Sequence, residues 1–554
     1  MAFQLSPGVL VTEKDLTNVI PAVSTSAGAF AGQFSWGPAE QIFTVGSENE
    51  LRKYFGLPLD TTDWFTAANF LAYGNNLQLV RVCGSAAQNA TADGGVTKYI
   101  PNRDAYEAES YAGGNGVGVV AAKYPGIYGN HIKVEMADAA SFTGWDYAAY
   151  FDAAPGTSTQ AFDAGSQNDE LHIVVVDTVG RFSGSAGTVL EKFAFTSKQF
   201  GNKLADGTNN YYKEVLNNQS QYVWWMDHPA STENWGSEAL TSFDTLLDPI
   251  SVTLAGGEDG SATDGDLENG YALFANKELV DISLVLTGGH SAAVCNYAID
   301  NVALARLDCV VFLSPPLAAV YNNAGNEAAD VVAYRQTDIN RNTSYAVMDS
   351  GWKRQYDRYN DTYINVPLNA DTAGLCARTD TTNDAWWSPA GFNRGQIKNV
   401  VKLVWAPNQT ERDTLYKNGV NPVATFPGEG TLLYGDKTLL AKPSAFDRIN
   451  VRRLFIVLEK AIATAAKYQL FEFNDVFTRA QFRSMVEPFL RDVRGRRGIY
   501  DFRVVCDETN NTGEVIDRNE FVADIYIKPA RSINFIYLNF VAVRTSVSFT
   551  EVGA

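Results

Sequence analysis

The sequence predicts a multidomain protein of mixed α/β and α+β class. A strand at 281–286, a helix at 291–306 and a strand at 309–313 follow one another, and a βαβ unit of this size supports a parallel sheet. From about 99 to 249 the sequence pattern changes to short runs of alternating apolar and polar residues, separated by clusters of Gly, Asn, Asp and Ser. This pattern is typical of β-structure. The 554 residues allow for several compact units.

The first hundred residues mix extended and helical patterns. Residues 5–13 alternate weakly around a Pro-Gly and predict an extended arm, which needs a partner to cover it. Small apolar residues at 27–34, a helix start at 47–51 and helical spacing of apolar groups at 64–73 precede a strand at 77–82. This order predicts an α/β domain.

Two amphipathic helices are predicted near the C-terminus. The first covers 451–471, and its apolar stripe is Val451, Leu454, Leu458, Ala461, Ala465 and Tyr468. The second carries the stripe Phe482, Met485, Val486, Phe489, Leu490 and Val493. Pro488 is expected to kink or divide this second helix.

Strands are predicted at 502–506, 521–527 and 533–549. The last is far longer than the five or six residues typical of a strand. We therefore expect it to leave its own subunit.

The charge distribution argues against general nucleic-acid binding. The formal net charge is −19, which repels a phosphate backbone. Residues 441–554 carry 17 basic and 14 acidic residues, whereas the rest carries 27 and 49, so the acidity belongs to the first four fifths.

Targeting and cysteine patterns indicate an unexported protein. The start lacks both a basic residue before Lys14 and the apolar segment of a secretory signal, and no apolar run is long enough to span a bilayer. The five cysteines are widely spaced without a CxxC pair, so we expect reduced, mostly buried thiols.

Catalytic motifs are weak. Gly289-His-Ser291-Ala-Ala293 lies between a predicted strand and helix as a hydrolase nucleophile does, but all four histidines precede Ser291, and capping of the helix explains the serine better. The sequence contains no phosphate-binding GxxxxGK[ST] loop and no HExxH, so no cofactor and no metal site are predicted. Paired carboxylates remain open, because their pairing is spatial.

Several C-terminal segments share their residues with one known family. They are Asp447–Ile456, Arg496–Asp501, Cys506–Asn511, Val515–Phe521 and Ile527–Asn534, with further matches at Ser6–Val9, Ala31–Pro38, Pro125–Asn130 and Tyr434–Leu439. Together they resemble tail sheath proteins of contractile-tailed bacteriophages. Residues from about 135 to 250 show little that matches, which fits an insertion that differs between sheaths.

The resemblance implies a C-terminal α/β domain with exchanged N- and C-terminal strands, a middle α/β domain and an inserted, mostly-β outer region of one or two domains. The expected order is an N-terminal linking arm (1–20), the middle domain (21–105 and 251–385) interrupted by the insertion (106–250), the inner C-terminal domain (386–532) and a C-terminal linking strand (533–554).

The implied function is structural and not enzymatic. Sheath subunits stack as hexameric rings around an inner tail tube, and contraction of this helical sheath drives the tube through the host envelope for genome delivery. The implied partners are further copies, the inner tube protein, and baseplate and tail terminator proteins, without direct nucleic-acid contact or membrane insertion. The implied location is the virion, after assembly in the host cytoplasm. The alternatives are the sheath of a phage-derived injection device such as a tailocin and, more distantly, an α/β hydrolase-like enzyme using Ser291.

The resemblance also suggests two sets of site residues. Family sheaths hold the tube through a C-terminal-domain helix by electrostatic contacts, and the candidates here are Arg479, Arg483, Arg491, Arg494, Arg496 and Arg497. Arms that add strands to neighbouring subunits would use Leu5, Val9, Val11, Ile533, Phe535, Tyr537, Val541 and Val543. Arg452 and Arg453 are expected to pair within the domain or between subunits.

Overall fold

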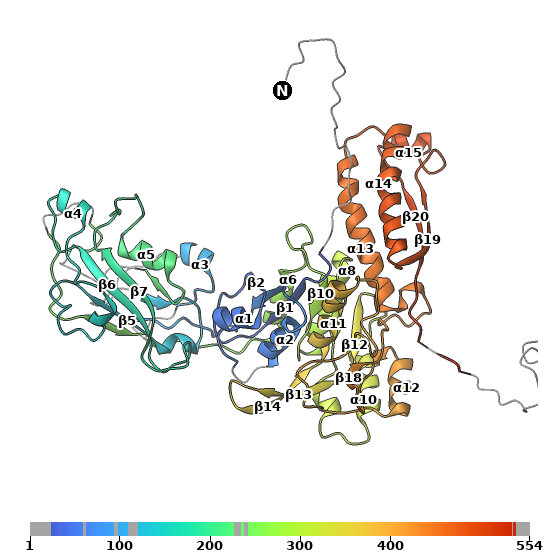
Figure 1. The fold of residues 1–554 in the computed structure, drawn as a ribbon, viewed down its shortest axis with the longest axis horizontal. Helices are drawn as coiled ribbons and strands as arrows, with labels where there is room; N and C mark the ends of the chain where they lie inside the picture. The colour runs from blue at the N-terminus through green and yellow to red at the C-terminus, as the bar shows by residue number, and fades with distance from the viewer. Residues whose placement is uncertain are drawn as a thin grey trace, which may run out of the picture. The chain divides into compact units, whose positions relative to one another are not determined.

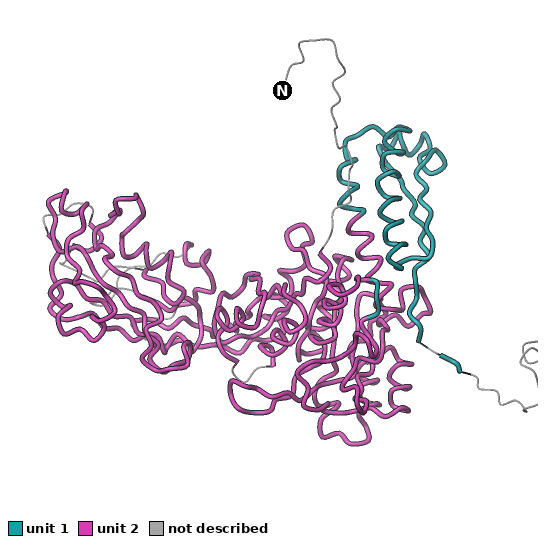
Figure 2. The backbone as a smooth tube through the Cα atoms, in the orientation of Figure 1, with its two compact units in different colours: residues 1–21, 386–388, 462–554 teal, residues 22–385, 389–461 magenta. Residues whose placement is uncertain are grey.

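The computed structural model describes residues 24–58, 62–92, 98–108, 120–226, 234–237, 242–534 and 536–538. The chain divides into two compact units, which Figure 2 shows in different colours. Unit 1 comprises 1–21, 386–388 and 462–554, and unit 2 comprises 22–385 and 389–461.

Unit 2 is built on a seven-stranded sheet of order β16-β12-β11-β10-β1-β3-β2 (Figure 1). All neighbours pair in parallel except β2, which lies antiparallel to β3 at one edge. The strands are β1 (Gly28–Gly32), β2 (Ile42–Val45), β3 (Leu77–Arg81), β10 (Leu284–Leu286), β11 (Val310–Leu313), β12 (Ala346–Asp349) and β16 (Val420–Asn421). The parallel pairing of β10 with β11 confirms the predicted βαβ unit.

Helices cover both faces of this sheet. Alternation along β1 sends Ala29 and Ala31 into one buried cluster and Phe30 into another. The first cluster includes side chains of α6 (Asp264–Ala272), α7 (Ala292–Tyr297), α10 (Glu327–Ala333) and α12 (Gln409–Lys417). The second includes side chains of α1 (Glu48–Phe55), α2 (Thr62–Leu71), α11 (Asn369–Thr382) and the start of α13 (Ile449–Ala466). A parallel sheet needs this double cover because both of its faces are apolar.

The helix predicted at 291–306 is continuous but not regular. It consists of α7, a π-helical segment η3 (Ala298–Ala303) and α8 (Leu304–Arg306). Ser291 caps it by accepting a hydrogen bond from the Val294 amide, which confirms the capping interpretation.

Residues 389–461 belong to unit 2, whereas the sequence prediction begins the inner C-terminal domain at 386. The reason is β16, whose two residues pair with β12 and complete the large sheet. A strand of two residues leaves no periodic signal in a sequence. Around it lie further short elements: α9 (Leu317–Val320), η4 (Tyr334–Ile339), β13 (Trp352–Asp357), β14 (Thr362–Pro367), β15 (Lys402–Leu403), β17 (Val423–Phe426), β18 (Gly430–Leu433) and η5 (Ala445–Asp447).

The region predicted as a mostly-β insertion carries two antiparallel sheets. One has the order β7-β6-β5-β9, and the other pairs β4 with β8. Its elements are α3 (Arg103–Ala108), β4 (Val120–Ala122), η1 (Ile127–His131), β5 (Ile132–Ala137), η2 (Ala148–Tyr150), α4 (Thr159–Asp163), β6 (Glu170–Asp177), β7 (Thr188–Ser197), α5 (Tyr212–Gln219), β8 (Val223–Trp225) and β9 (Ile250–Thr253). Trp224 and Trp225 are fully buried, so they are core residues as expected.

Unit 1 contains the end of α13, the turn η6 (Lys467–Gln469), α14 (Val476–Gly495), α15 (Gly513–Asp517) and the antiparallel pair β19 (Ile499–Val505) and β20 (Asp524–Pro529). Five of the six residues in each predicted helical stripe are buried. The exceptions are Tyr468, which is 72% exposed because α13 ends before it, and Phe489, which is half-buried.

Helix α14 runs unbroken through Pro488, so of the two expected effects the division is wrong, and the kink stays a prediction. Proline costs a helix interior about 3 kcal/mol through its missing N–H and its ring. Here Pro488 lies on the exposed side, while Met485, Val486, Leu490 and Val493 bury the opposite face on both sides of it. This packing stabilises the helix on both sides of the proline.

In the described part of the chain, the helices are too short or too polar to cross a bilayer.

Candidate functional site

The structure fixes the point at which the N-terminal arm leaves unit 2. The Ser283 hydroxyl donates to the Ser24 carbonyl at 3.0 Å, and the Arg453 guanidinium donates to the Thr25 carbonyl at 3.1 Å. The Ser283 and Leu284 amides both donate to the Ala27 carbonyl. The arm is therefore held by backbone carbonyls immediately before β1, while Leu5, Val9 and Val11 lie outside the described residues.

Arg453 is the centre of this anchor and is almost fully buried. Its guanidinium lies 2.5 Å from the Asp380 carboxylate, which is also buried, and reaches the Cys376 carbonyl at 3.4 Å. Burial alone would lower the pKa of Arg453, but the Asp380 carboxylate outweighs it and raises the pKa above its ordinary value. Arg453 thus stays charged and pairs within unit 2, which is one of the two expectations for it.

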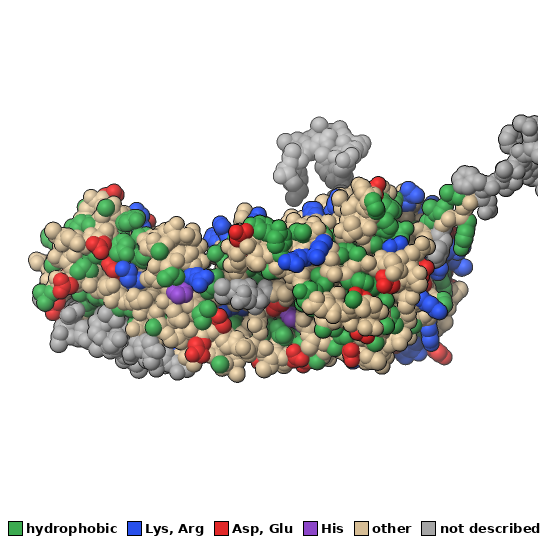
Figure 3. Space-filling model, turned by 90° about the horizontal axis from the view of Figure 1, so that it is seen from below, with side chains coloured by type: hydrophobic (Ala, Val, Ile, Leu, Met, Phe, Trp, Pro, Cys, Tyr) green, Lys and Arg blue, Asp and Glu red, His purple; other side chains and the backbone are tan. Residues whose placement is uncertain are grey.

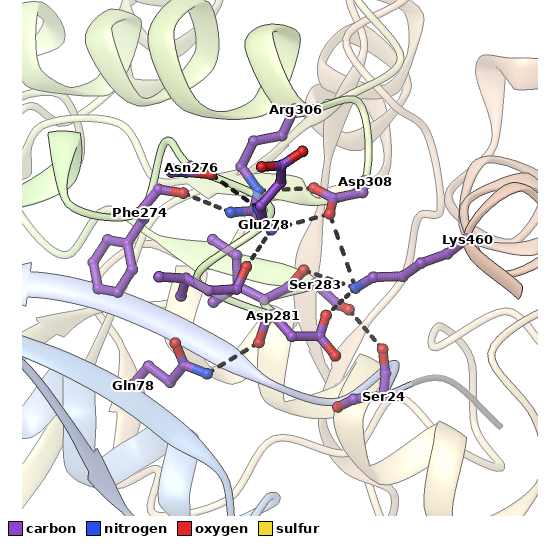
Figure 4. Close-up of polar contacts among 12 residues, drawn as sticks. Ser24, Gln78, Phe274, Asn276, Glu278, Asp281, Ser283, Arg306, Asp308 and Lys460 are labelled. Atoms are coloured by element: carbon purple, nitrogen blue, oxygen red, sulfur yellow. Dashed lines mark hydrogen bonds and ion pairs between the residues drawn. The ribbon is translucent and has the colours of Figure 1, made fainter. Parts of the chain in front are cut away.

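Lys460, two turns further along α13, secures the neighbouring strand (Figure 4). Its ammonium donates to the Asp281 carboxylate and to the Ile282 carbonyl, and lies 4.0 Å from Asp308. Asp308 in turn binds Arg306 at 2.8 Å. A small pocket follows this contact line and is lined by Ser24, Thr25, Ser283, Arg453, Ile456, Val457 and Lys460.

In unit 1, the β19–β20 pair presents unpaired edges. Among the described residues this sheet has only two strands, so each strand has one edge without a strand partner. One face of the sheet is half-buried through Phe502, Val504 and Ile525, whereas Tyr526 on the other face is 61% exposed. An isolated pair of strands is marginally stable, and its open edges invite another strand.

The C-terminal segment begins beside these edges. The Ala530 amide donates to the Gly498 carbonyl, after which the chain leaves the sheet. Ile533 and Tyr537 are 82% and 85% exposed and belong to no strand in the described part of the segment. Phe535, Val541 and Val543 lie outside the described residues.

Arg479 is not on the exposed face of α14, contrary to its place among the candidate tube contacts. It is 94% buried, and its guanidinium donates to the carbonyls of Asp475 at 3.1 Å and Asn511 at 3.3 Å. The helical period explains this result, because Arg479 shares a face with Phe482 and Val486.

Arg491 and Arg494 of α14 are exposed, unlike Arg479. Arg491 lies 3.6 Å from Glu487, and Arg494 lies 3.9 Å from Asp501, with every one of these side chains at least two-fifths exposed. Such surface pairs contribute little and exchange readily. Arg483 is half-buried on the same side of the helix.

The last two candidate arginines, Arg496 and Arg497, follow the C-terminus of α14 and lie over two adjacent tryptophans. Arg497 has a φ of 66°, and the Gly498 and Arg497 amides donate to the Val493 and Arg494 carbonyls, which is a Schellman ending. The guanidiniums of Arg496 and Arg497 then lie 5.2 Å from the ring centres of Trp386 and Trp387, respectively. The sequence analysis missed this contact, because the tryptophans are more than a hundred positions away from the arginines. The only hint in the sequence was that two tryptophans, Trp386 and Trp387, are adjacent.

Charges of both signs are interspersed on the face shown in Figure 3.

The hydrolase alternative lacks the geometry it needs. The Ser291 hydroxyl donates to the Asp264 carboxylate at 2.7 Å, whereas His290 lies 3.4 Å from Asp63 and stacks on Phe30. The serine is thus oriented by an acid at a helix start and the histidine is directed to another carboxylate.

Three domains of one family match the chain. They are the N-terminal region of tail sheath protein Gp18 domain III at residues 28–82, the phage tail sheath protein central domain at 269–439 and the phage tail sheath C-terminal domain at 441–542. The fold and its two units therefore define the class of contractile-tail sheath proteins.

Relatives of known identity agree over the full length. The tail sheath protein of Vibrio phage KVP40 is 36% identical, and that of Enterobacteria phage T4 is 34% identical, each alignment covering 99% of both chains. The protein belongs to the phage tail sheath protein family, whose named members are structural components of virions.

Solved structures share the fold at low identity. A sheath tail protein from Listeria innocua is 12% identical with a TM-score of 0.53, covering 92% of this chain and 96% of that one. The helical sheath of the anti-feeding prophage in its contracted state is also 12% identical with a TM-score of 0.53, covering 98% and 99%.

Proposed function

We propose that the protein polymerises as stacked hexameric rings around an inner tail tube and contracts to drive this tube through the host envelope. The observation that carries the proposal is the open β19–β20 sheet of unit 1, which stands beside an exposed apolar C-terminal segment. A subunit built in this way completes its sheet only with strands from other copies. Baseplate and tail terminator proteins are the proposed partners at the two ends of the polymer.

Strand exchange supplies the links between copies. Main-chain hydrogen bonds hold the exchanged strand, while the segment that leads to it can bend as subunits move. The anchor of Ser24 and Thr25 on Arg453 and Ser283 gives the N-terminal arm a fixed origin. A pull on the arm is thereby transmitted to β1 in the centre of the large sheet.

The tube contact is proposed for the exposed side of α14, through Arg491, Arg494 and the half-buried Arg483, with Arg496 and Arg497 at its end. Arg479 is left out because its guanidinium is buried. Exposed charge pairs are weak and are screened by salt, which suits a grip that is released on contraction. The energy for contraction would come from two packings of the same rigid units, without a bound nucleotide or other cofactor.

A second candidate is the sheath of a phage-derived injection device. The fold shared with the contracted anti-feeding prophage sheath favours it. Electron microscopy of the complete particle distinguishes the two functions, since a phage sheath is joined to a DNA-filled head.

Electron microscopy of the purified protein tests polymerisation itself. We expect rings or helical tubes, and stable monomers at high concentration would contradict the proposal. A variant lacking residues 1–15 should remain folded by circular dichroism but form no tubes. Normal tubes from this truncation would overturn the strand-exchange mechanism.

A further inference from the structure

Unit 1 exposes a concentrated group of large apolar side chains in the connection between α13 and α14 and in the first turn of α14. We name this group the apolar turn, and its exposed fractions range from 64% to 105%. Its members are Tyr468, Leu470, Phe471, Phe473, Val476 and Phe477. Contiguous apolar patches of this kind usually mark interaction sites.

The apolar turn lies at a defined end of unit 1. Asn474, within the turn, donates to the Asn511 side chain at 3.2 Å and to the Glu520 carbonyl at 2.8 Å. Both acceptors belong to the connection between β19 and β20. The apolar turn therefore lies at the end of the sheet where β19 finishes and β20 begins.

Phe471, in the middle of the apolar turn, has an unusual backbone conformation. Phe471 has a φ of 70°, a conformation that a bulky residue adopts at a cost of about 1–3 kcal/mol. Its side chain is nonetheless fully exposed in the subunit. Burial of the Phe471 side chain within the subunit therefore does not offset this cost.

The C-terminal segment has the matching chemistry. In an extended strand, Phe535, Tyr537 and Val541 would share one face with Asn539, and Ile536, Leu538 and Phe540 would share the other, so this stretch is largely apolar on both sides. Ile536 and Leu538 are 75% and 72% exposed. From Val543 to Phe549 only one side stays apolar.

A strand that is apolar on both sides does not fit the β19–β20 sheet alone. One face of that sheet packs on α14, but the other carries exposed polar groups such as Arg503 and Tyr526. The 17 residues from 533 to 549 would extend about 56 Å, against about 23 Å for the seven residues of β19. Part of the added segment must therefore lie beyond the sheet.

The two ends of the β19–β20 sheet differ in the surface that could contact the part of the segment that extends beyond the sheet. Where α14 finishes, Arg496 and Arg497 cover Trp386 and Trp387. Where α14 begins, the apolar turn is exposed. Only the second end provides a large apolar surface among the described residues of unit 1.

We propose that the apolar turn is the docking site for the C-terminal segment of a second copy, around Ile536 and Leu538, while the remainder of that segment pairs with the β19–β20 edge. This inference rests on the proposed strand exchange and adds a second contact to it. The link between copies would then combine apolar side-chain contacts with the main-chain hydrogen bonds of the added strand.

Cross-linking tests the two contacts separately. The five native cysteines are buried, so introduced surface thiols will be the reactive ones. Subunits carrying Phe477→Cys are mixed with subunits carrying Leu538→Cys, allowed to assemble without tube protein and oxidised. We expect cross-linked dimers in the mixture and not in either population alone.

A parallel mixture pairs Ser548→Cys with Tyr500→Cys or Tyr526→Cys and reports strand addition at the sheet edge. If this second pair cross-links and the first does not, strand exchange stands and the apolar-turn contact is refuted. If neither pair cross-links in assembled tubes, strand exchange itself fails.

Serine substitutions test the energetic importance of the turn. Replacing Phe471, Phe473 and Phe477 with Ser should raise the protein concentration needed for tube-free assembly at least tenfold, with an unchanged circular dichroism spectrum. The control replaces Leu247 and Leu279 of unit 2, which are 96% and 82% exposed, and should assemble normally. Normal tube-free assembly of the triple variant, whether or not it loses binding to the inner tube, would overturn the proposal.

Discussion

Helices α13 and α14 follow one another in the chain but use arginine in opposite ways. Arg452 and Arg453 of α13 are about 95% buried, with their guanidiniums committed to aromatic rings, a carboxylate and backbone carbonyls. Arg491 and Arg494 of α14 are 62% and 49% exposed and lie 3.6 and 3.9 Å from partly exposed carboxylates. The difference shows that arginine content alone does not identify a binding face; the helical position decides whether the charge stabilises the fold or is available to a partner.

The largest effect on stability is expected at the buried arginine. Arg453→Met leaves the Asp380 carboxylate buried without its cation, and loss of one partner of a buried pair costs about 3–5 kcal/mol. Urea denaturation of the subunit measures the loss. The double variant Arg453→Met with Asp380→Asn removes the orphaned charge and should recover much of the stability. A loss below about 1 kcal/mol in the single variant would contradict the role of Arg453 as the anchor.

An intermediate effect is expected where α14 ends. A Cβ on Gly498 would lie 2.8 Å from Val493 Cγ1 and 3.1 Å from the Trp386 ring, so Gly498→Ala should destabilise unit 1 by about 1–3 kcal/mol through overpacking. Gly495→Ala is the matched control, because a Cβ there meets nothing within 4 Å and alanine favours the helix. Thermal unfolding compares the two variants. Equal melting temperatures would contradict the prediction, because they would mean that Val493 and Trp386 move aside for the added Cβ at little cost in free energy.

The smallest effect on stability is expected at the exposed arginines. Arg491→Glu with Arg494→Glu should change the free energy of unfolding by no more than about 0.5 kcal/mol, because both side chains are solvated. The same change should weaken tube-templated assembly, and the deficit should shrink as added salt screens the charges. Co-sedimentation with purified tube provides the measurement.

The matched control for this pair is Arg518→Glu, which reverses another exposed arginine of unit 1 that pairs with Glu520. It should leave tube binding unchanged. Unaltered co-assembly of the Arg491 and Arg494 variant would refute the tube-grip assignment while leaving strand exchange untouched.

Sequence patterns predicted the elements of the fold better than their grouping. The parallel strands β3, β10 and β11 and the helices α2 and α13 were recognisable because apolar periodicity reports which residues are buried. The grouping of 389–461 with unit 2 was not, since β16 is too short to produce a pattern. The insertion's tryptophans were correctly assigned to a core, because large aromatic pairs are usually buried.

The candidate site was only partly predictable for a related reason. A run of arginines marks a charged segment, but Arg479 faces inward and Arg496 lies over Trp386, a contact that depends on tertiary structure. The exposure of Tyr468 and Phe471 also followed from where α13 ends, which periodicity locates only to within a few residues.

The His290–Asp63 pair lies near the point where the order of strands in the large sheet reverses. Strand order reverses between β1 and β10, and the crevice at the carboxyl ends of such neighbouring strands is where open α/β proteins usually hold a ligand. Here Phe30 and His290 stack in that position, Asp63 accepts from the Gln33 amide, and Asn369 exchanges two hydrogen bonds with Gly288. The position where such sheets usually hold a ligand is therefore occupied here by packed and hydrogen-bonded side chains of the protein itself, which stabilise the centre of the sheet.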